Sequence, residues 1–216
     1  MIKSVFFDFD GTLADTSEGI IRSSLAMQER MGLPLTSREQ ICSGIGLPLR
    51  ESIKLGSGVP EERADEGVLI YREIYAQEAF GLTKPFPGVR EALESLRSSG
   101  VVMAIATSRS SRSLHIMLES MGFTHFFSDI LTADDHFAYK PAPDMVLALL
   151  ERLHCSNDRT LVVGDTTYDI MMGSGARCRT CGVTWGNHDR ATLSTASPDW
   201  IIDGMAELPA IIEQTI

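Results

Sequence analysis

Short apolar runs that end in polar residues alternate with stretches of helical periodicity along most of this chain. In a parallel sheet, each strand is joined to the next by a helix, so this alternation is typical of βαβ units. The apolar runs cover residues 4–7, 101–106, 129–132, 160–163, 180–184 and 200–202, and the helical stretches cover 89–98, 111–121, 143–153 and 168–176. The pattern predicts an α/β fold with a central parallel sheet.

Residues 16–83 interrupt the alternation, because they contain helical periodicity without an apolar strand-like run. Apolar residues from Ile20 to Met31 form one stripe that ends at Gly32. Ser37 with Gln40 resembles a capping box, and Pro60 opens a second long helical stretch. We predict an all-helical insert at 16–82 within a core formed by 1–15 and 83–216, with linkers near 14–16 and 81–84.

Asp8 and Asp10 follow the first apolar run, and Gly11 comes directly after them. Side chains two residues apart on a strand point the same way, roughly 6.5 to 7 Å apart, so both carboxylates can face one reacting centre. Two unpaired carboxylates repel each other and any phosphate. The pair therefore indicates a phosphoryl-transfer site that holds a cation. On this motif alone, an ordinary turn with side-chain to backbone hydrogen bonds is an equal alternative.

Composition narrows the class of partner. The chain has 29 acidic and 19 basic residues, for a net charge of −10, and no basic stripe, so nucleic acid is not an expected partner. No leader-like or membrane-spanning apolar stretch is evident, and the default expectation is a cytoplasmic protein with no membrane contact. Cys178 and Cys181 form a C-x-x-C pair without further ligands, which favours simple packing over redox or zinc chemistry.

Polar residues follow several of the predicted strands, where ligands bind in open parallel sheets. Thr107 and Ser108 follow the second strand in the chain, Asp165 and Asp169 follow the fourth, and Lys140 lies in a loop before a helix. Together with Asp8 and Asp10, four carboxylates face one lysine. Binding an anionic substrate there requires a divalent ion. None of the five histidines has metal-ligand spacing.

These motifs resemble those of the haloacid dehalogenase-like hydrolase superfamily, and within it the phosphoglycolate phosphatase-like enzymes with a small helical cap. The resemblance covers essentially the whole chain. It implies a Rossmann-like three-layer core, with residues 16–82 as the cap domain. The matching segments, in order, are Asp8-Phe9-Asp10-Gly11-Thr12-Leu13, Ala106-Thr107-Ser108, Lys140-Pro141-Ala142-Pro143-Asp144 and Gly164-Asp165-Thr166-Thr167-Tyr168-Asp169.

The resemblance also implies roles that make chemical sense. Asp8 would attack phosphorus and form an aspartyl-phosphate, and Asp10 would protonate the leaving oxygen and then activate water. Mg²⁺ would be bound by the Asp8 carboxylate, the Asp10 backbone carbonyl and Asp165, with Asp169 anchoring this shell from the next layer. The phosphoryl oxygens would be held by Gly11, Thr107, Ser108 and Lys140.

In the insert, the stretch 44–49 resembles the substrate-facing loop of that subgroup. Gly44 and Gly46 are therefore candidate specificity residues, although glycines also serve ordinary helix–helix turns. Arg50 follows this loop. Two interpretations are open: its guanidinium contacts a substrate anion, or its aliphatic stem covers the surface of the insert.

The expected activity is Mg²⁺-dependent hydrolysis of a small phosphomonoester, such as a phosphoglycolate-like or sugar phosphate, by a monomer or weak homodimer. The alternatives are a phosphosugar mutase of the β-phosphoglucomutase kind and an inorganic pyrophosphatase. A phospho-accepting signalling receiver also pairs a strand-end aspartate with threonine and lysine, but it needs neither Asp10 nor a helical insert. Dehalogenase chemistry is disfavoured because those relatives lack the second aspartate.

Overall fold

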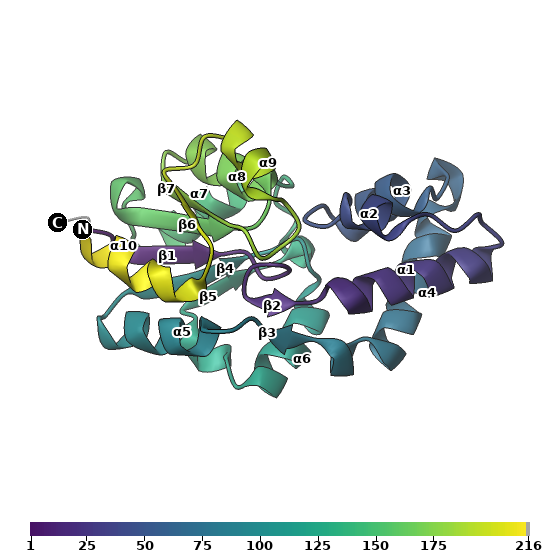
Figure 1. The fold of residues 1–216 in the computed structure, drawn as a ribbon, viewed down its shortest axis with the longest axis horizontal. Helices are drawn as coiled ribbons and strands as arrows, with labels where there is room; N and C mark the ends of the chain where they lie inside the picture. Colours follow the sequence, from purple (N-terminus) through teal and green to yellow (C-terminus); the bar gives the residue numbers. More distant parts are fainter. Residues whose placement is uncertain (215–216) are drawn as a thin grey trace.

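The computed structural model describes residues 1–214, in which a parallel sheet and a group of helices lie side by side (Figure 1). The sheet has six strands in the order β5-β4-β1-β6-β7-β8, and every neighbouring pair is parallel. Its strands are β1 (Ser4–Phe7), β4 (Val102–Ala106), β5 (Asp129–Leu131), β6 (Thr160–Gly164), β7 (Arg179–Val183) and β8 (Trp200–Ile202). The predicted α/β fold with a central parallel sheet is confirmed.

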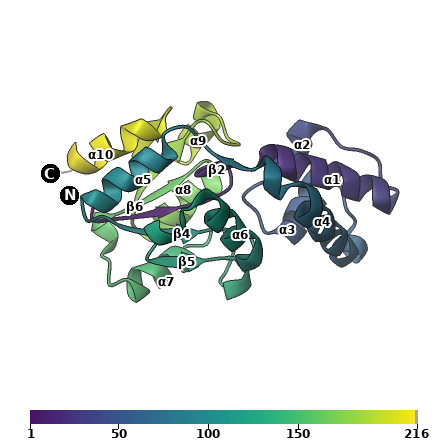
Figure 2. The same ribbon diagram turned by 90° about the horizontal axis from the view of Figure 1, so that it is seen from below.

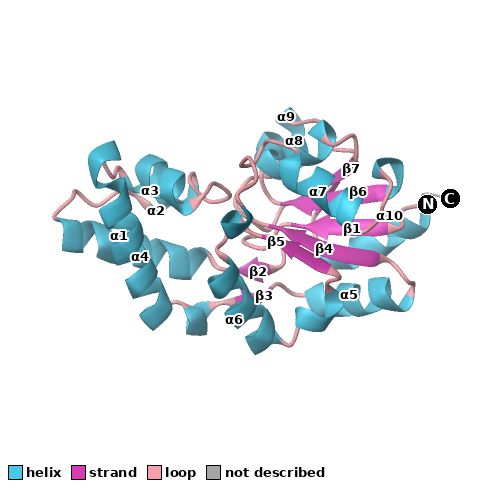
Figure 3. Cartoon of the chain, turned by 180° about the vertical axis from the view of Figure 1, so that it is seen from behind, coloured by secondary structure: helices cyan, strands magenta, loops and turns pink. Residues whose placement is uncertain are grey.

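Helices cover both faces of this sheet, as the strand sequences require. In β1, Val5 and Phe7 pack on one face with α5 and α6, whereas Phe6 packs on the other face with α7. All three side chains are fully buried. The helices around the sheet are α5 (Val89–Ser98), α6 (Ser111–Met121), α7 (Asp144–Arg152), α8 (Thr167–Gly175), α9 (Arg190–Thr195) and α10 (Leu208–Gln214). Figure 3 shows α5 and α6 on one side of the sheet and α7 and α8 on the other.

The segment between β2 and β3 is entirely helical. It contains α1 (Ser17–Met31), α2 (Arg38–Cys42), α3 (Leu49–Ser57) and α4 (Ala64–Glu78), which lie beyond one end of the sheet (Figure 2). Helix α1 ends at Gly32, whose φ of 67° closes the helix as the sequence predicts. Ser37 caps α2 through the amide of Gln40, but no return bond from the Gln40 side chain is present in residues 1–214, so the capping box is only half formed.

Two short crossings join these helices to the sheet. Strands β2 (Ala14–Asp15) and β3 (Lys84–Pro85) pair antiparallel at the positions where the sequence places the linkers. We propose from this pairing that residues 16–82 are the cap domain and that 1–15 with 83–216 are the core domain. Single 3₁₀ turns occur at Glu61–Arg63, Phe80–Leu82, Thr124–Phe126, Ala133–Asp135, Asn157–Arg159 and Met205–Glu207.

Three expectations about local structure need correction or comment. The polar composition of residues 187–197 predicts a loop, and this prediction is wrong, because α9 forms within the segment and is capped by the Asp189 side chain. Helix α3 was not predicted as a separate element. The thiols of Cys178 and Cys181 are free and buried, and burial raises the pKa of each to about 12. Both thiols are therefore protonated at neutral pH, which agrees with simple packing. No helix within residues 1–214 combines the length and apolar character needed to cross a membrane.

Candidate active site

The register of the sheet brings three predicted site residues to one edge. Strand β1 lies between β4 and β6, with Phe7 opposite both Ile105 and Val163. The residues just after these strands, Asp8, Thr107 and Asp165, therefore meet at the carboxyl ends of the central strands. A cavity of about 1020 Å³ is lined by Asp8 and Thr107 from the sheet side and by residues of the helical insert.

Lys140 joins two of the predicted carboxylates. Its Nζ lies 2.5 Å from Oδ1 of Asp8 and 2.7 Å from Oδ1 of Asp169, and all three side chains are buried. The other oxygen of Asp169 accepts from the amide and the hydroxyl of Thr166 at 3.0 and 2.7 Å. Within residues 1–214, Oδ2 of Asp8 accepts no hydrogen bond, and Asp8 lines the cavity. This leaves one carboxylate oxygen available for chemistry.

The charges in this cluster are not balanced. Burial raises the pKa of Asp8 well above its usual value, and the nearby charges of Asp169 and Asp165 raise it further, against the opposing effect of Lys140. Burial and the charge of Asp169 also raise the pKa of Asp165, to about 7. Burial works against the charge on Lys140, but the two carboxylates outweigh it and raise its pKa. When all three carboxyl groups are ionised, the site therefore has an excess of negative charge over the single ammonium of Lys140.

A divalent cation would balance this excess of negative charge. Asp8, Asp165 and Asp169 each offer a carboxylate oxygen within 4.8 Å of the others, and carboxylate oxygen is the ligand type that Mg²⁺ prefers. Asp165 is oriented by the Thr12 hydroxyl at 3.0 Å and by the amide and side chain of Asn187, each at 2.7 Å. Asn187 was missed because it lies on the loop interpreted only as polar. The predicted roles of the Asp10 carbonyl as ligand and of Asp169 as anchor stay predictions.

Gly11 has a steric reason to be glycine. Its φ is +80°, and a Cβ built there would lie 2.2 Å from Oδ2 of Asp165. Its own N–H donates to the Ala14 carbonyl at 2.9 Å. The absence of a side chain at Gly11 therefore allows the close approach of Asp165. The Gly11 N–H is bound to Ala14 in this conformation, so a contact of this N–H with phosphate would require the hydrogen bond to Ala14 to open.

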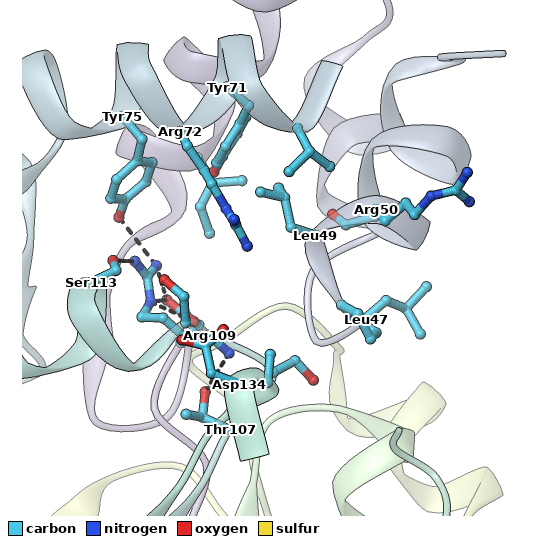
Figure 4. A pocket seen from close by; sticks show the side chains of 18 of the residues that line it. Leu47, Leu49, Arg50, Tyr71, Arg72, Tyr75, Thr107, Arg109, Ser113 and Asp134 are labelled. Carbon is cyan, nitrogen blue, oxygen red and sulfur yellow. Dashed lines mark hydrogen bonds and ion pairs between the residues drawn. The ribbon is translucent and has the colours of Figure 1, made fainter. Parts of the chain in front are cut away.

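Asp10 has a strong partner that the sequence analysis did not identify. Nε of Arg109 lies 3.0 Å from Oδ2 of Asp10, and the Thr16 hydroxyl donates to Oδ1 at 2.6 Å. Arg109 also donates to the Tyr75 hydroxyl at 3.2 Å and to Oγ of Ser113 at 2.6 Å (Figure 4). Arg109 directly follows the Thr107–Ser108 pair, so inspecting one further residue after the strand would have found it. Asp8 and Asp10 line the same cavity, but Asp10 is not part of the carboxylate cluster around Lys140.

The Gly44–Leu49 loop of the insert reaches the sheet side through Gly46. The Ser108 hydroxyl donates to the Gly46 carbonyl at 2.7 Å. Gly46 has a φ of +95°, and a Cβ there would lie 3.2 Å from Cγ2 of Thr166. Thr107, which is buried, accepts at its Oγ1 from the Arg109 amide at 3.2 Å. Gly46 and the predicted phosphate-binding pair are therefore brought together.

Gly44 and Arg50 lie differently from Gly46. A Cβ at Gly44 would lie 2.7 Å from the Ser52 carbonyl oxygen, so this glycine serves packing within the insert. Arg50 borders the cavity, but its guanidinium pairs with Glu61 at 2.7 Å and Asp65 at 3.1 Å and is directed away from Arg109 (Figure 4). In this conformation, Arg50 covers the insert surface.

We expect Mg²⁺ to stabilise the protein through the carboxylate cluster. At about 100 times its Kd, a ligand that binds only the folded state adds about 2.7 kcal/mol, which corresponds to a rise of roughly 5 to 10 °C in Tm for a chain of this size. Asp165→Asn removes one of the three candidate carboxylates and should abolish the rise. Differential scanning fluorimetry with MgCl₂, against NaCl at equal ionic strength, checks this. An equal rise in both salts, or an undiminished Mg²⁺ effect in the variant, contradicts it.

The fold and the site together define a class of protein: a parallel α/β core with a buried lysine among carboxylates at the carboxyl ends of its central strands. The family of haloacid dehalogenase-like hydrolases matches residues 5–183. This chain belongs to that family.

Individual relatives are similar over nearly their full length. The chain is 36% identical to "Probable phosphatase IndB" from Dickeya dadantii, covering 94% of this chain and 90% of the relative. It is 33% identical to the pyrophosphatase PpaX from Bacillus velezensis, over 96% and 94%, and 30% identical to a phosphoglycolate phosphatase from Vibrio parahaemolyticus, over 98% and 96%. A solved hydrolase of the haloacid dehalogenase-like family from Streptococcus pneumoniae superposes with a TM-score of 0.86 at 26% identity, over 97% and 98%.

Proposed function

We propose that this protein is a Mg²⁺-dependent phosphatase that hydrolyses a small phosphomonoester through an aspartyl-phosphate on Asp8. One observation carries the proposal: Asp8 is buried at the end of β1 and paired with Lys140, while its second oxygen is unengaged beside the cavity. The names of the relatives, which include phosphatases acting on phosphoglycolate and on pyrophosphate, support the reaction class.

The first step forms a bond between an Asp8 oxygen and phosphorus as the ester P–O bond breaks. Lys140 keeps Asp8 oriented through its 2.5 Å contact and holds a positive charge beside the attacking carboxylate. Thr107 and Ser108 follow the end of β4, the strand that pairs with β1, and in this proposal the Thr107 hydroxyl and the Ser108 amide bind phosphoryl oxygens. A bound Mg²⁺ supplies further charge stabilisation for the phosphoryl oxygens.

In this proposal, Asp10 is the proton donor to the leaving group and the proton acceptor from water. A protonated Asp10 gives its proton to the leaving alkoxide, and the resulting carboxylate takes a proton from the water that attacks the aspartyl-phosphate. That attack breaks the bond between phosphorus and the Asp8 oxygen, and it releases inorganic phosphate and free Asp8. Arg109 now donates to both oxygens of Asp10, so at least one of these bonds must be released before Asp10 can donate a proton.

A panel assay tests this proposal. Purified protein with Mg²⁺ is expected to release phosphate from at least one member of a panel of phosphoglycolate, hexose phosphates, nucleotides and inorganic diphosphate, with the specificity constants ranking the substrates. Loss of release on adding EDTA and its return on adding Mg²⁺ identify the cation requirement. No release from any member overturns the proposal. Isomerisation of a hexose phosphate in the presence of a bisphosphate activator would instead identify a mutase.

The alternative hypothesis of a pyrophosphatase is based on the similarity to PpaX. It uses the same residues, since diphosphate presents the same phosphoryl group with phosphate as the leaving group. A specificity constant for diphosphate at least tenfold above every ester in the panel would select it.

A further inference from the structure

Nearly all the positive side chains of the insert are neutralised by carboxylates. Residues 16–82 contain seven lysines and arginines, and six of them form ion pairs within the insert. The exception is Arg72 on α4, which has no hydrogen-bond or ion-pair partner in residues 1–214. The paired cations are Arg22, Arg30, Arg38, Arg50, Lys54 and Arg63.

Arg72 is also the insert cation that points into the cavity. It lines the cavity wall, and Figure 4 shows its side chain extending from α4 between Tyr71 and Leu49 toward Arg109. The neighbouring carboxylate of Glu73 is occupied by Arg30 at 3.0 Å. In a chain with a net charge of −10, Arg72 has no carboxylate partner within residues 1–214. Its guanidinium can therefore form charge-assisted hydrogen bonds with an anionic group of a ligand.

Two positive side chains near Asp8 are already paired with carboxylates. Lys140 is held by Asp8 and Asp169, and Arg109 is held by Asp10. These groups can serve the transferring phosphoryl group and the proton-transfer residue. For the rest of the substrate, the cavity lining offers Arg72 from the insert and Arg112 from α6, which also has no hydrogen-bond or ion-pair partner in residues 1–214. The cavity volume, about 1020 Å³, is at the upper end of small-molecule sites and leaves room beyond a phosphoryl group.

We propose that Arg72 binds a second anionic group, a carboxylate or a phosphate, on the leaving-group side of the substrate. The preferred substrate is then a phosphate ester or anhydride that carries two anionic ends, with one end at Asp8 and the other at α4. This inference rests on the proposed phosphatase function. Because Arg72 comes from the insert and Asp8 from the sheet, a doubly anionic substrate bridges the two and favours their close approach.

The test compares two esters of similar size that differ at the far end: phosphoglycolate, with a carboxylate, and 2-hydroxyethyl phosphate, with a neutral hydroxyl. Wild-type enzyme is expected to prefer phosphoglycolate. Arg72→Gln should lower kcat/KM for phosphoglycolate by about 10- to 100-fold, the loss of one charge-assisted contact, and change it less than about twofold for 2-hydroxyethyl phosphate. Arg72→Lys should retain an intermediate preference, since it keeps the charge but not the planar donor pair.

Arg22→Gln is the matched control, because Arg22 is an exposed arginine of the insert paired with Glu18, away from the cavity. It should leave both specificity constants unchanged. An equal loss on both esters in Arg72→Gln, no loss on either, or a wild-type preference for the neutral ester overturns the inference while the phosphatase function stands. If wild-type enzyme hydrolyses neither these esters nor any other member of the panel, the proposed function itself fails.

Discussion

Replacing Asp8 by asparagine should lower kcat for phosphate release by on the order of 10⁴- to 10⁶-fold, as removal of a covalent nucleophile does in other hydrolases. The asparagine amide keeps the size of the side chain but is not a nucleophile toward phosphorus. The measurement is phosphate release under saturating substrate, together with mass spectrometry of the quenched enzyme. An adduct of one phosphoryl group is expected on the wild-type protein and absent from Asp8→Asn.

The same variant should remain folded. Burial and the charges of Asp169 and Asp165 raise the pKa of Asp8, so a neutral side chain at this position removes a repulsive charge from the cluster. Lys140 keeps its contact with Asp169 at 2.7 Å. We therefore expect a Tm within a few degrees of wild type. Asp158→Asn, in an exposed turn, is the control for a generic change of charge. Full activity in Asp8→Asn would disprove the assignment of the nucleophile.

Much of the core was predictable because local pattern and long-range packing agree there. The strand at Trp200–Ile202 and the helices at Val89–Ser98 and Ser111–Met121 have the bounds that the apolar periodicity indicates. In a parallel sheet, the carboxyl ends of adjacent strands must meet at one edge. That rule predicts that Asp8, Thr107 and Asp165 lie near one another, as the register of the sheet shows.

The remaining features depend on contacts between distant parts of the chain. Arg109 directly follows the Thr107–Ser108 pair, so its place at the strand end is readable from the sequence, but its partner Asp10 is 99 residues away and is met only when the chain folds. Asn187 is 22 residues from Asp165 and lies on a loop whose composition indicates only exposure. The position of Arg50 in the sequence suggests a substrate ligand, but its guanidinium forms ion pairs with three nearby carboxylates of the insert. Contacts that form only in the folded chain decide these cases, and sequence spacing does not encode them.

Lys140→Met should be the most destabilising single change at the site. Its side chain is fully buried between Asp8 and Asp169, so methionine leaves both carboxylates without their cation. Breaking a buried ion pair on one side costs about 3 to 5 kcal/mol of the free energy of unfolding. Urea denaturation measured without divalent ions should give a loss in this range. Lys3→Met, an exposed lysine near the start of the chain, should change the free energy of unfolding by less than about 0.5 kcal/mol.

A double variant separates the ion-pair effect from lost packing. If the cost of Lys140→Met comes from uncompensated charge, removing one of those charges as well should recover part of it. Lys140→Met with Asp8→Asn should therefore be more stable than Lys140→Met alone, with a coupling energy of about 1 to 3 kcal/mol. Mg²⁺ should also restore stability to Lys140→Met more strongly than to wild type, because the cation replaces the missing positive charge among the same carboxylates. Additive single effects would show that Lys140 contributes by packing, and they would remove the electrostatic basis for placing a cation beside Asp8.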